Sequence, residues 1–470
     1  MSVLLSLVLF FLIWLSGALL AVLVKTKSFI EVLGLGFILG TFMFTLSLIF
    51  YHSFTGSPIN VQAVFIVSGG MTLLLSPFIP RLLILSRQSQ SILKKISRMS
   101  LAIKIVIGIL FTLVFISAIQ NFFWPITDWD AMALYDFRAK IVAETGSFSL
   151  GRELGYFYQY PPFTSLLHTS VYVLGFQRAK IWYSFLYGSF LLVFYSLSRK
   201  QTSPSLSLSA TLALAVNPLI AEHAIIAYTN LAYTMFLGLG IVYLWQWFTT
   251  RDSQSVILGG VLVAASCWSR SSEPFWLVGV MLLVGIAFLA MKHKIIKSFI
   301  FSILGALLIF WLRTVWPHFT APFLATVIEQ IEPVSEDGTA SQMFSQIAGL
   351  TGYFKIFARI DLATFVERFV EVSKYFYNNV ASVFALYFFP GMILLFFDIK
   401  SKQYRSLLRW MTTIDYVFLI FLGTFLFSFS FDSWNEIGGS ANRMSMFLIP
   451  LFIFSIFTSK TLLEWVEKIK

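Results

Sequence analysis

The chain has almost none of the residues that form disulfides or metal clusters. Its 470 residues include one cysteine, Cys267, so no intramolecular disulfide can form and cysteine-based zinc sites lack their ligands. The five histidines, which show no metalloprotease spacing, are His52, His168, His223, His293 and His318. There is also no Walker glycine loop, no dinucleotide fingerprint and no Gly-x-Ser-x-Gly elbow, which argues against phosphate-loop enzymes and serine hydrolases.

Charged residues are scarce as well. They make up 12% of the chain, whereas soluble domains carry about 25%. The sequence is 58% hydrophobic and 18% aromatic, with a mean hydropathy of +0.83. This composition predicts an all-α protein, a polytopic transmembrane helical bundle of about 13 spans. The predicted spans cover residues 3–24, 32–51, 61–80, 104–123, 181–198, 205–220, 229–248, 255–269, 275–291, 298–314, 378–397, 413–431 and 444–459.

The net charge of +11 follows a membrane pattern. With the N-terminus outside, the predicted spans place 21 of the 33 Lys and Arg residues, but only 6 of the 22 acidic residues, on the cytoplasmic side. The inner face then carries +15 and the outer face −4, in agreement with the positive-inside rule. We therefore expect a multi-pass protein of the cell (plasma or inner) membrane that does not bind nucleic acid. Residues 3–24 exceed a signal-peptide core and lack a basic start, so we expect a retained span.

Two longer outer loops interrupt the otherwise short connections, at residues 124–180 and 315–377. We predict a three-span N-terminal extension over residues 1–103 and a membrane core over residues 104–470. Residues 161–177 are apolar, but counting them as a span would move several basic clusters to the outer side. We expect them to form a juxtamembrane or half-inserted helix, which the Pro161-Pro162 pair is suited to start.

Each outer loop contains a predicted amphipathic helix. In the first loop, Ala131, Leu134, Tyr135 and Ala139 recur with helical spacing along one apolar side, while Arg138 and Lys140 are expected elsewhere on the helix. The second loop has a comparable pattern at residues 361–376. Loops held by a rigid scaffold are the usual location of catalytic groups. His168, in the juxtamembrane helix, is expected to be structural.

Asp128 and Asp130 are the main catalytic candidates. They lie close together after Trp124-Pro125, next to the outer end of a predicted span. One can act as a general base or a metal-coupled carboxylate while the other tunes its pKa by like-charge proximity. The simpler alternative is helix capping, because an Asp before Ala-Met-Ala-Leu is a favourable N-cap. Capping explains one of the two acids, and we prefer Asp130 as the base.

Further substrate-binding candidates lie at other outer span ends. Glu222 and His223 can line the same cavity or be ordinary interfacial residues. Arg270 and Glu273 can orient an anionic or sugar substrate, or simply form an i, i+3 ion pair. Arg443 opens the last span from the outer side, where it can bind phosphate through its planar guanidinium or pack on aromatic rings.

The order of these motifs resembles the GT-C superfamily of polytopic glycosyltransferases, in particular the protein-mannosyltransferase and lipid A aminoarabinose transferase branch (glycosyltransferase family 39-like). The resemblance rests on four segments: Asp128-Trp-Asp130 with Tyr135 and Ala139, Tyr160-Pro-Pro-Phe163, Trp268-Ser-Arg270-Ser-Ser-Glu273, and Asn442-Arg443 leading to Pro450. It implies an outer-face active site, a polyprenyl-phosphate sugar donor and inverting transfer to a lipid, glycan or protein acceptor. The acidic catalytic residue of the first outer loop then corresponds to Asp128 or Asp130. No cofactor is certain; a divalent metal is compatible with this chemistry but not required.

The chain departs from the family pattern at one carboxylate. Relatives commonly have an Asp in a Tyr-Ala-Asp-Leu-Pro type segment, whereas this chain has Tyr228-Thr-Asn230-Leu-Ala. Asn230 cannot act as a base, so a second-carboxylate role would move to Glu222 or be absent. The substrate-binding set predicted from the sequence is Arg138, Tyr160, Glu222, His223, Asn230, Arg270, Glu273 and Arg443.

Two other functions fit an outer-face membrane protein of this size. A transporter or flippase of lipid-linked glycans should carry ionisable residues near span midpoints and paired half-repeats, which the sequence does not display. A glycan polymerase or ligase would depend on outer arginines and histidine rather than on an Asp pair after the first core span.

Overall fold

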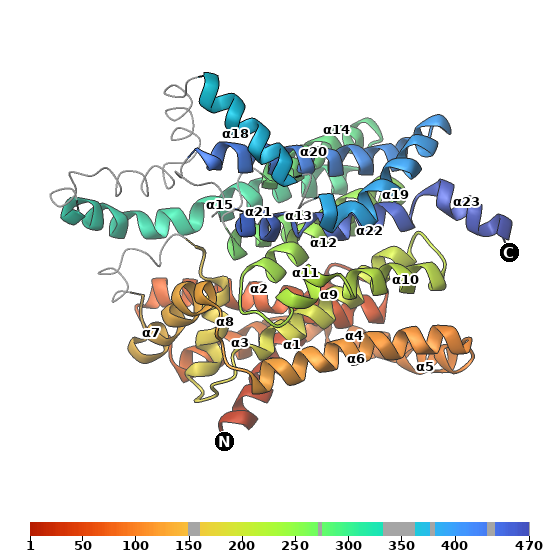
Figure 1. Ribbon diagram of the computed structural model, residues 1–470. Helices are drawn as coiled ribbons and strands as arrows, with labels where there is room; N and C mark the ends of the chain where they lie inside the picture. Colours follow the sequence, from red (N-terminus) through yellow and green to blue (C-terminus); the bar gives the residue numbers. More distant parts are fainter. Residues whose placement is uncertain (149–159, 271–274, 332–361, 377–380, 430–437, 470) are drawn as a thin grey trace. The chain divides into compact units, whose positions relative to one another are not determined.

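The structure is a computed structural model that describes all residues except 149–159, 271–274, 332–361, 377–380, 430–437 and 470 (Figure 1). Every regular element among the described residues is a helix, which confirms the all-α class. The chain divides into two compact units, Met1–Trp316 and Pro317–Lys470, and we describe each by itself.

The first unit holds fourteen α-helices and the start of another. They are α1 (Ser2–Leu23), α2 (Phe29–Thr55), α3 (Val61–Leu75), α4 (Ile79–Ser86), α5 (Gln88–Ser97), α6 (Leu101–Phe123), α7 (Phe137–Thr145), α8 (Phe163–Tyr172), α9 (Ile181–Arg199), α10 (Pro204–Ala215), α11 (Pro218–His223), α12 (Asn230–Thr250), α13 (Ser253–Ser269), α14 (Phe275–Lys292) and α15 (Ile296–Ile331). The second unit holds α18 (Leu362–Tyr375), α19 (Ala381–Lys400), α20 (Tyr404–Ser428), α21 (Gly438–Ser445), α22 (Leu448–Phe457) and α23 (Lys460–Ile469).

Within the described residues, nine helices are long and apolar enough to cross a membrane, or ten if the bent pair Ala441–Phe457 and Lys460–Lys468 is one span. These helices indicate a multi-pass membrane protein. Among the described residues, the thirteen predicted spans are not all found as uninterrupted membrane-length helices. The predicted span 205–220 is divided into α10 and α11, because Pro218 cannot continue α10 and the Asn217 side chain caps α11 by accepting from the amide of Leu219 at 3.1 Å.

The first two helices approach each other very closely at glycines. A Cβ atom on Gly40 would collide with the carbonyl oxygen of Ile13, and one on Gly17 would collide with the carbonyl oxygen of Gly36. Small residues are what allow helix backbones to pack at this distance in a membrane protein. The pair α1–α2 also packs on α3, and α2 packs on α9 and α8. The boundary predicted at residues 103 and 104 stays a prediction.

Gly40→Ala is expected to lower the stability of the protein by about 1–3 kcal/mol, since the new methyl group meets backbone that cannot move aside cheaply. Gly70→Ala is the matched control, because nothing lies within 4 Å of a Cβ at Gly70 in α3. That control should be neutral or slightly stabilising through helix propensity. Thermal unfolding of both variants in lipid measures the difference; an equal loss in both would contradict the close-packing argument.

The short helices α7 and α8 lie at the same end of the first unit (Figure 1). Figure 1 shows α7 and α8 at that end, with α5 and the turn between α9 and α10 at the opposite end. Gly146 ends α7 with a positive φ of 72°, and its carbonyl accepts from the amide of Ile59 at 2.8 Å. A Cβ at Gly146 would collide with Pro58. The turn between α2 and α3 therefore fixes the end of α7.

The second unit confirms the helix predicted at residues 361–376, which is α18. Phe365 and Phe369 of α18 pack edge-on against Phe425 of α20 at ring-centroid distances of 5.1 and 5.8 Å. The break between α22 and α23 is held by a buried guanidinium, since Arg409 donates to the hydroxyl of Thr458 at 2.6 Å. The Arg409 contacts with Thr458 thus fix the chain next to the 46° bend between Ala441–Phe457 and Lys460–Lys468.

Candidate functional site

A π-helical turn, η2 (Ala131–Asp136), follows directly on the Asp128-Trp-Asp130 segment and leads into α7. Ala131 and Tyr135 are buried, which confirms the predicted apolar side of this helix. Asp128 and Asp130 are both half-buried. Asp130 has helical φ and ψ angles and forms no side-chain capping hydrogen bond, so the capping interpretation does not hold for it. Single π-helical turns are frequent at functional sites.

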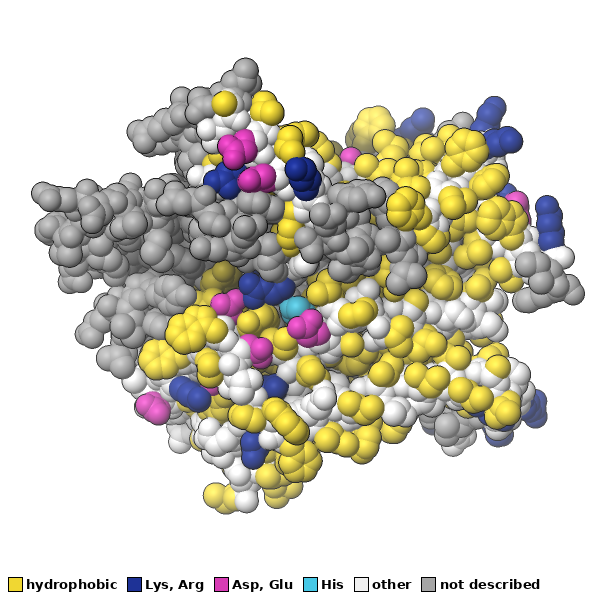
Figure 2. Space-filling model, in the orientation of Figure 1, with side chains coloured by type: hydrophobic (Ala, Val, Ile, Leu, Met, Phe, Trp, Pro, Cys, Tyr) yellow, Lys and Arg dark blue, Asp and Glu magenta, His cyan; other side chains and the backbone are white. Residues whose placement is uncertain are grey.

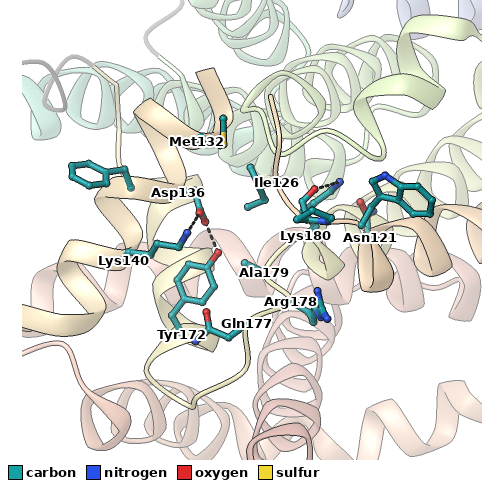
Figure 3. A pocket seen from close by; sticks show the side chains of 13 residues that line it. Asn121, Ile126, Met132, Asp136, Lys140, Tyr172, Gln177, Arg178, Ala179 and Lys180 are labelled. Carbon is teal, nitrogen blue, oxygen red and sulfur yellow. Dashed lines mark hydrogen bonds and ion pairs between the residues drawn. The ribbon is translucent and has the colours of Figure 1, made fainter. Parts of the chain in front are cut away.

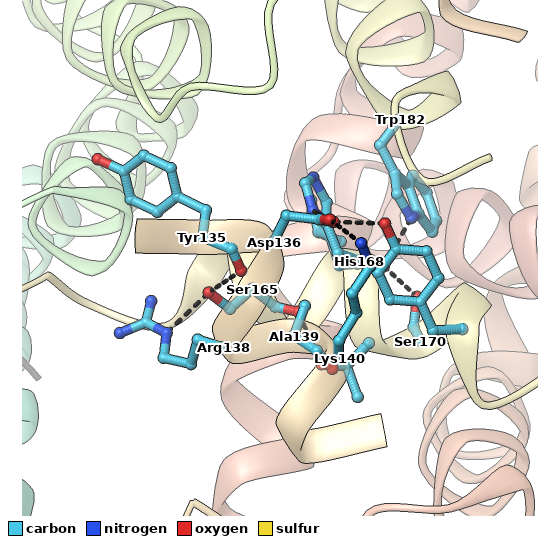
Figure 4. Close-up of polar contacts among 12 residues, drawn as sticks. Tyr135, Asp136, Arg138, Ala139, Lys140, Ser165, His168, Ser170 and Trp182 are labelled. Atoms are coloured by element: carbon cyan, nitrogen blue, oxygen red, sulfur yellow. Dashed lines mark hydrogen bonds and ion pairs between the residues drawn. The ribbon is translucent and has the colours of Figure 1, made fainter. Parts of the chain in front are cut away.

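The buried carboxylate of this segment is Asp136, which the sequence interpretation did not select. Its Oδ1 atom accepts from the hydroxyl of Tyr172 and lies 3.1 Å from Nδ1 of His168, and both partners belong to α8 (Figure 4). Its Oδ2 atom forms an ion pair with Lys140, one helical turn further along, at 2.8 Å. The Asp136 side chain is thus held on both oxygens.

The hydrogen bonds set the tautomer of a neutral His168 ring. A carboxylate only accepts, so Nδ1 carries the proton and donates to Asp136. In the neutral ring Nε2 is then the acceptor for the hydroxyl of Tyr183, 3.3 Å away on α9. His168 is fully buried, as predicted for a structural residue. It joins Asp136 on η2 to α9 through two defined hydrogen bonds.

The environment of Asp136 keeps it ionised. Burial alone would raise its pKa, but the hydrogen bonds from His168, Lys140 and Tyr172 outweigh this and lower the pKa to about 2. Burial raises the pKa of Tyr172, and the charge on Asp136 raises it further. Asp136 is therefore a poor general base near neutral pH, and its chemistry suits orienting α7 against α8.

A pocket of about 280 Å³ opens beside this network (Figure 3). Its polar lining consists of Asn121, Asp136, Lys140, Tyr172, Gln177, Arg178 and Lys180. Lys180 is buried and donates to the carbonyl of Pro125 at 3.3 Å. Burial lowers the pKa of Lys180, and the nearby charge of Asp128 partly offsets this. The pocket thus has three cationic side chains in its lining. One of them, Lys180, interacts with the catalytic candidate Asp128, which is not itself a lining residue.

Arg138 is placed differently from the expectation. The prediction that it lies away from the apolar side is wrong, since Arg138 is buried. Its guanidinium donates to Ser165 Oγ at 2.7 Å and to the carbonyls of Tyr160 and Pro161 at 2.7 and 3.0 Å. These acceptors compensate the burial of the charge. Arg138 therefore positions the turn that begins α8, and its predicted role in substrate binding stays a prediction.

A second polar chain brings together three of the predicted substrate-binding residues. His223 Nδ1 donates to the carbonyl of Leu219 at 3.0 Å, so its Nε2 accepts from the amide nitrogen of Asn230 at 3.1 Å. The Asn230 oxygen then faces Arg270, which donates to it. The order of donors sets the orientation of the Asn230 amide, and Asn230 in turn orients the guanidinium of Arg270. His223 and Asn230 are buried, and Arg270 is half-buried.

Tyr135 and Tyr160 connect the polar residues around Asp136 with the polar chain around Asn230. The Arg270 guanidinium lies 5.8 Å from the ring centroid of Tyr160, whose ring packs edge-on against Tyr135 at 5.7 Å. The hydroxyl of Tyr135 is 3.4 Å from Thr229 Oγ1, directly before Asn230. Burial raises the pKa of Tyr135 to about 12. The turn η2 therefore presents Tyr135 toward Arg270 and Asp136 toward His168.

The other predicted residues are distributed as follows. Glu222 is exposed next to the buried His223. Glu273 lies outside the described residues. Arg443 is half-buried on α21, in the second unit, where its phosphate-binding role stays a prediction. Figure 2 shows acidic, basic and histidine side chains gathered on one face within an otherwise hydrophobic surface.

Asn230→Asp is expected to raise the pH at which His223 titrates relative to the wild type, because a carboxylate accepts hydrogen bonds and favours the imidazolium. The signal of the His223 ring can be followed by NMR during a pH titration and assigned with His223→Gln. Asn60→Asp, which changes the cap of α3, is the control with the same charge change. A shift of equal size in that control would show a general charge effect and not the proposed contact.

Among the described residues, no group of three or more His, Cys, Asp or Glu side chains is arranged to hold a metal ion. Comparison of the chain with protein-family models, with characterised proteins and with solved structures finds no match. The function must therefore be argued from the site itself.

Proposed function

We propose that the protein is a membrane glycosyltransferase that moves a sugar from a polyprenyl-phosphate donor to a lipid, glycan or protein acceptor on the outer face of the cell membrane. The observation that carries the proposal is the pocket beside Asp136. It is lined by Lys140, Arg178 and Lys180, and Asp128 interacts with Lys180. Cationic side chains suit a phosphate group, and a carboxylate within the same region suits an acceptor hydroxyl.

The reaction requires one proton transfer and one bond exchange. The acceptor hydroxyl attacks the anomeric carbon of the donor sugar, and the bond between that carbon and the phosphate oxygen breaks. Asp130, or Asp128 in its place, takes the hydroxyl proton. Polyprenyl phosphate leaves with the electron pair, and its negative charge is stabilised by the cationic side chains of the pocket and by Arg270. Electrostatic stabilisation of this kind is usually the largest catalytic contribution.

The contacts support different roles for Asp136 and for the pair Asp128 and Asp130. Asp136 is paired with Lys140, His168 and Tyr172, so its carboxylate holds the helices that carry the site. Asp128 and Asp130 are half-buried at the start of the same turn and can meet a substrate. The oriented Arg270 beside Tyr160 offers a guanidinium and an aromatic face, a combination that suits a phosphosugar.

The test is transfer of label from polyprenyl-phosphate sugars by the purified full-length protein in lipid vesicles. Formation of a labelled glycosidic product supports the proposal. If preformed lipid-linked glycans are joined while simple donors are inert, a polymerase or ligase replaces it. If label crosses the membrane without a new glycosidic bond, a flippase or transporter replaces it.

A further inference from the structure

A second pocket lies at the end of the first unit opposite α7 and α8, and no part of the proposed reaction uses it. It has a volume of about 620 Å³, within the range of about 300–1,000 Å³ typical of ligand pockets. Apolar side chains of α5, α6, α9 and α10 form its walls, among them Ile96, Ile107, Leu191 and Leu208. We propose that this pocket binds one anionic phospholipid of the membrane, with an acyl chain inside and the headgroup at its polar end.

The geometry of two helices creates the pocket. Helices α6 and α9 are in close contact at Gly188, where a Cβ atom would lie 3.3 Å from Val114. On the side toward the start of α6 and the end of α9, the pocket between them is lined by Ile107 and Tyr195. Both helices are apolar enough to be membrane spans, and α6 is almost entirely unburied by protein. Its surroundings are therefore hydrocarbon, and the natural occupant is an apolar chain.

Helix α5 forms the floor of the pocket and is fixed in place. The Gln88 side chain, at the start of α5, donates to the carbonyl of Lys27 at 3.2 Å and accepts from the amide of Phe29 at 3.1 Å. Ile92 and Ile96, one helical turn apart on α5, line the pocket. An amphipathic helix held in this way can cover a lipid chain with its apolar side while the exposed Lys94 remains in the headgroup region.

The basic residues at the polar end of this pocket favour an anionic headgroup. The polar lining includes Ser28, Ser196 and Arg199, and the lining contains no acidic residue. Glu31 lies nearby, but its Oε1 atom is paired with Lys200 at 2.9 Å and with the hydroxyl of Tyr243 at 2.7 Å. The segment 81–104 adds six Lys or Arg residues and no Asp or Glu. Such a basic cluster attracts anionic lipids.

The experiment is native mass spectrometry of the full-length protein from mixed micelles with phosphatidylglycerol or phosphatidylcholine. One phosphatidylglycerol molecule should stay bound under conditions that remove phosphatidylcholine. Ile107→Trp fills the pocket and should lower the occupancy about tenfold, whereas Ile105→Trp, exposed on the same helix and outside the pocket, should not. Ile96→Trp tests the same prediction from α5, in case one variant misfolds.

Arg199→Gln tests the headgroup contact separately. It should reduce the preference for phosphatidylglycerol about fivefold, the size expected for one basic residue near an anionic headgroup. Lys292→Gln, an exposed residue at the end of α14, is the charge control. Equal binding of both lipids, equal loss with Ile105→Trp, or binding of polyprenyl phosphate in place of phospholipid would overturn the proposal. None of these outcomes depends on glycosyl transfer.

Discussion

Asp130→Asn is expected to reduce glycosyl transfer by about 100- to 10,000-fold, the usual contribution of a general base. Asparagine has nearly the same shape but cannot take the proton of an acceptor hydroxyl. Because the proposed phosphate contacts come from basic side chains and not from Asp130, binding of the donor should be largely unchanged. Transfer rates and donor affinity, measured with the purified protein in vesicles, separate these two effects.

Glu144→Gln is the matched control for this experiment. Glu144 is an exposed acid near the end of α7, so its neutralisation changes the net charge by the same amount on a continuous helical segment. Its transfer rate should equal that of the wild type. Full activity in Asp130→Asn combined with a large loss in Asp128→Asn would move the base to Asp128, which interacts with Lys180. Full activity in both variants would refute the role of this acidic pair.

The elements that could be predicted from the sequence are those with local causes. The short helix after Pro161-Pro162 is α8, since a proline pair and an apolar pattern define it within a few residues. The apolar side of residues 131–142 and the helix at residues 361–376 follow from helical spacing alone. These patterns need no knowledge of distant contacts.

The division of the predicted span 205–220 also has a local signal in the sequence. Asn217-Pro218 combines a capping side chain with a residue that cannot continue a helix, and both act at this position. A mean hydropathy over residues 205–220 does not detect this break, because the residues on both sides of it are apolar. Hydropathy alone therefore predicts one span. A proline next to a good N-cap residue inside an apolar run predicts two helices instead of one.

The centre of the site could not be predicted, because its partners are far apart in the chain. Asp136 pairs with Lys140 at i, i+4, which is visible in the sequence, but its buried partners His168 and Tyr172 are more than thirty residues away. The sequence pattern places Arg138 away from the apolar side, whereas acceptors on Tyr160, Pro161 and Ser165 compensate its burial in the structure. Such contacts exist only once α7 and α8 are packed.

The sequence also did not predict the contacts among His223, Asn230 and Arg270. The sequence placed each of them near an outer span end, and the substitution of a carboxylate by Asn230 raised the question of what the amide does. The structure answers part of it, since the amide accepts from Arg270 and donates to His223. Both contacts of Asn230 depend on a neutral His223, which no sequence pattern specifies.

Asp136→Ala is expected to destabilise the first unit by about 3–5 kcal/mol, because removal of one partner leaves buried polar groups uncompensated. His168 and Tyr172 are buried and would lose their acceptor. Lys140→Ala should cost less than about 1 kcal/mol, since the lysine side chain is 55% exposed and an exposed ion-pair partner can return to water. Equilibrium unfolding in mixed micelles measures both, and similar losses for the two variants would contradict the buried network.

The pH dependence of the same measurement identifies the charge of Asp136 as the cause. Its pKa falls from an ordinary value of 3.8 to about 2 in the folded protein, so the ionised group stabilises folding at pH values above 4. That contribution, on the order of 2 kcal/mol, is lost as the pH falls from 4 toward 2. Asp136→Asn retains an acceptor oxygen but no charge, so its stability should approach that of the wild type over this interval. A gap that stays constant with pH would mean that Asp136 acts through packing, because only a change in ionisation makes the two curves converge.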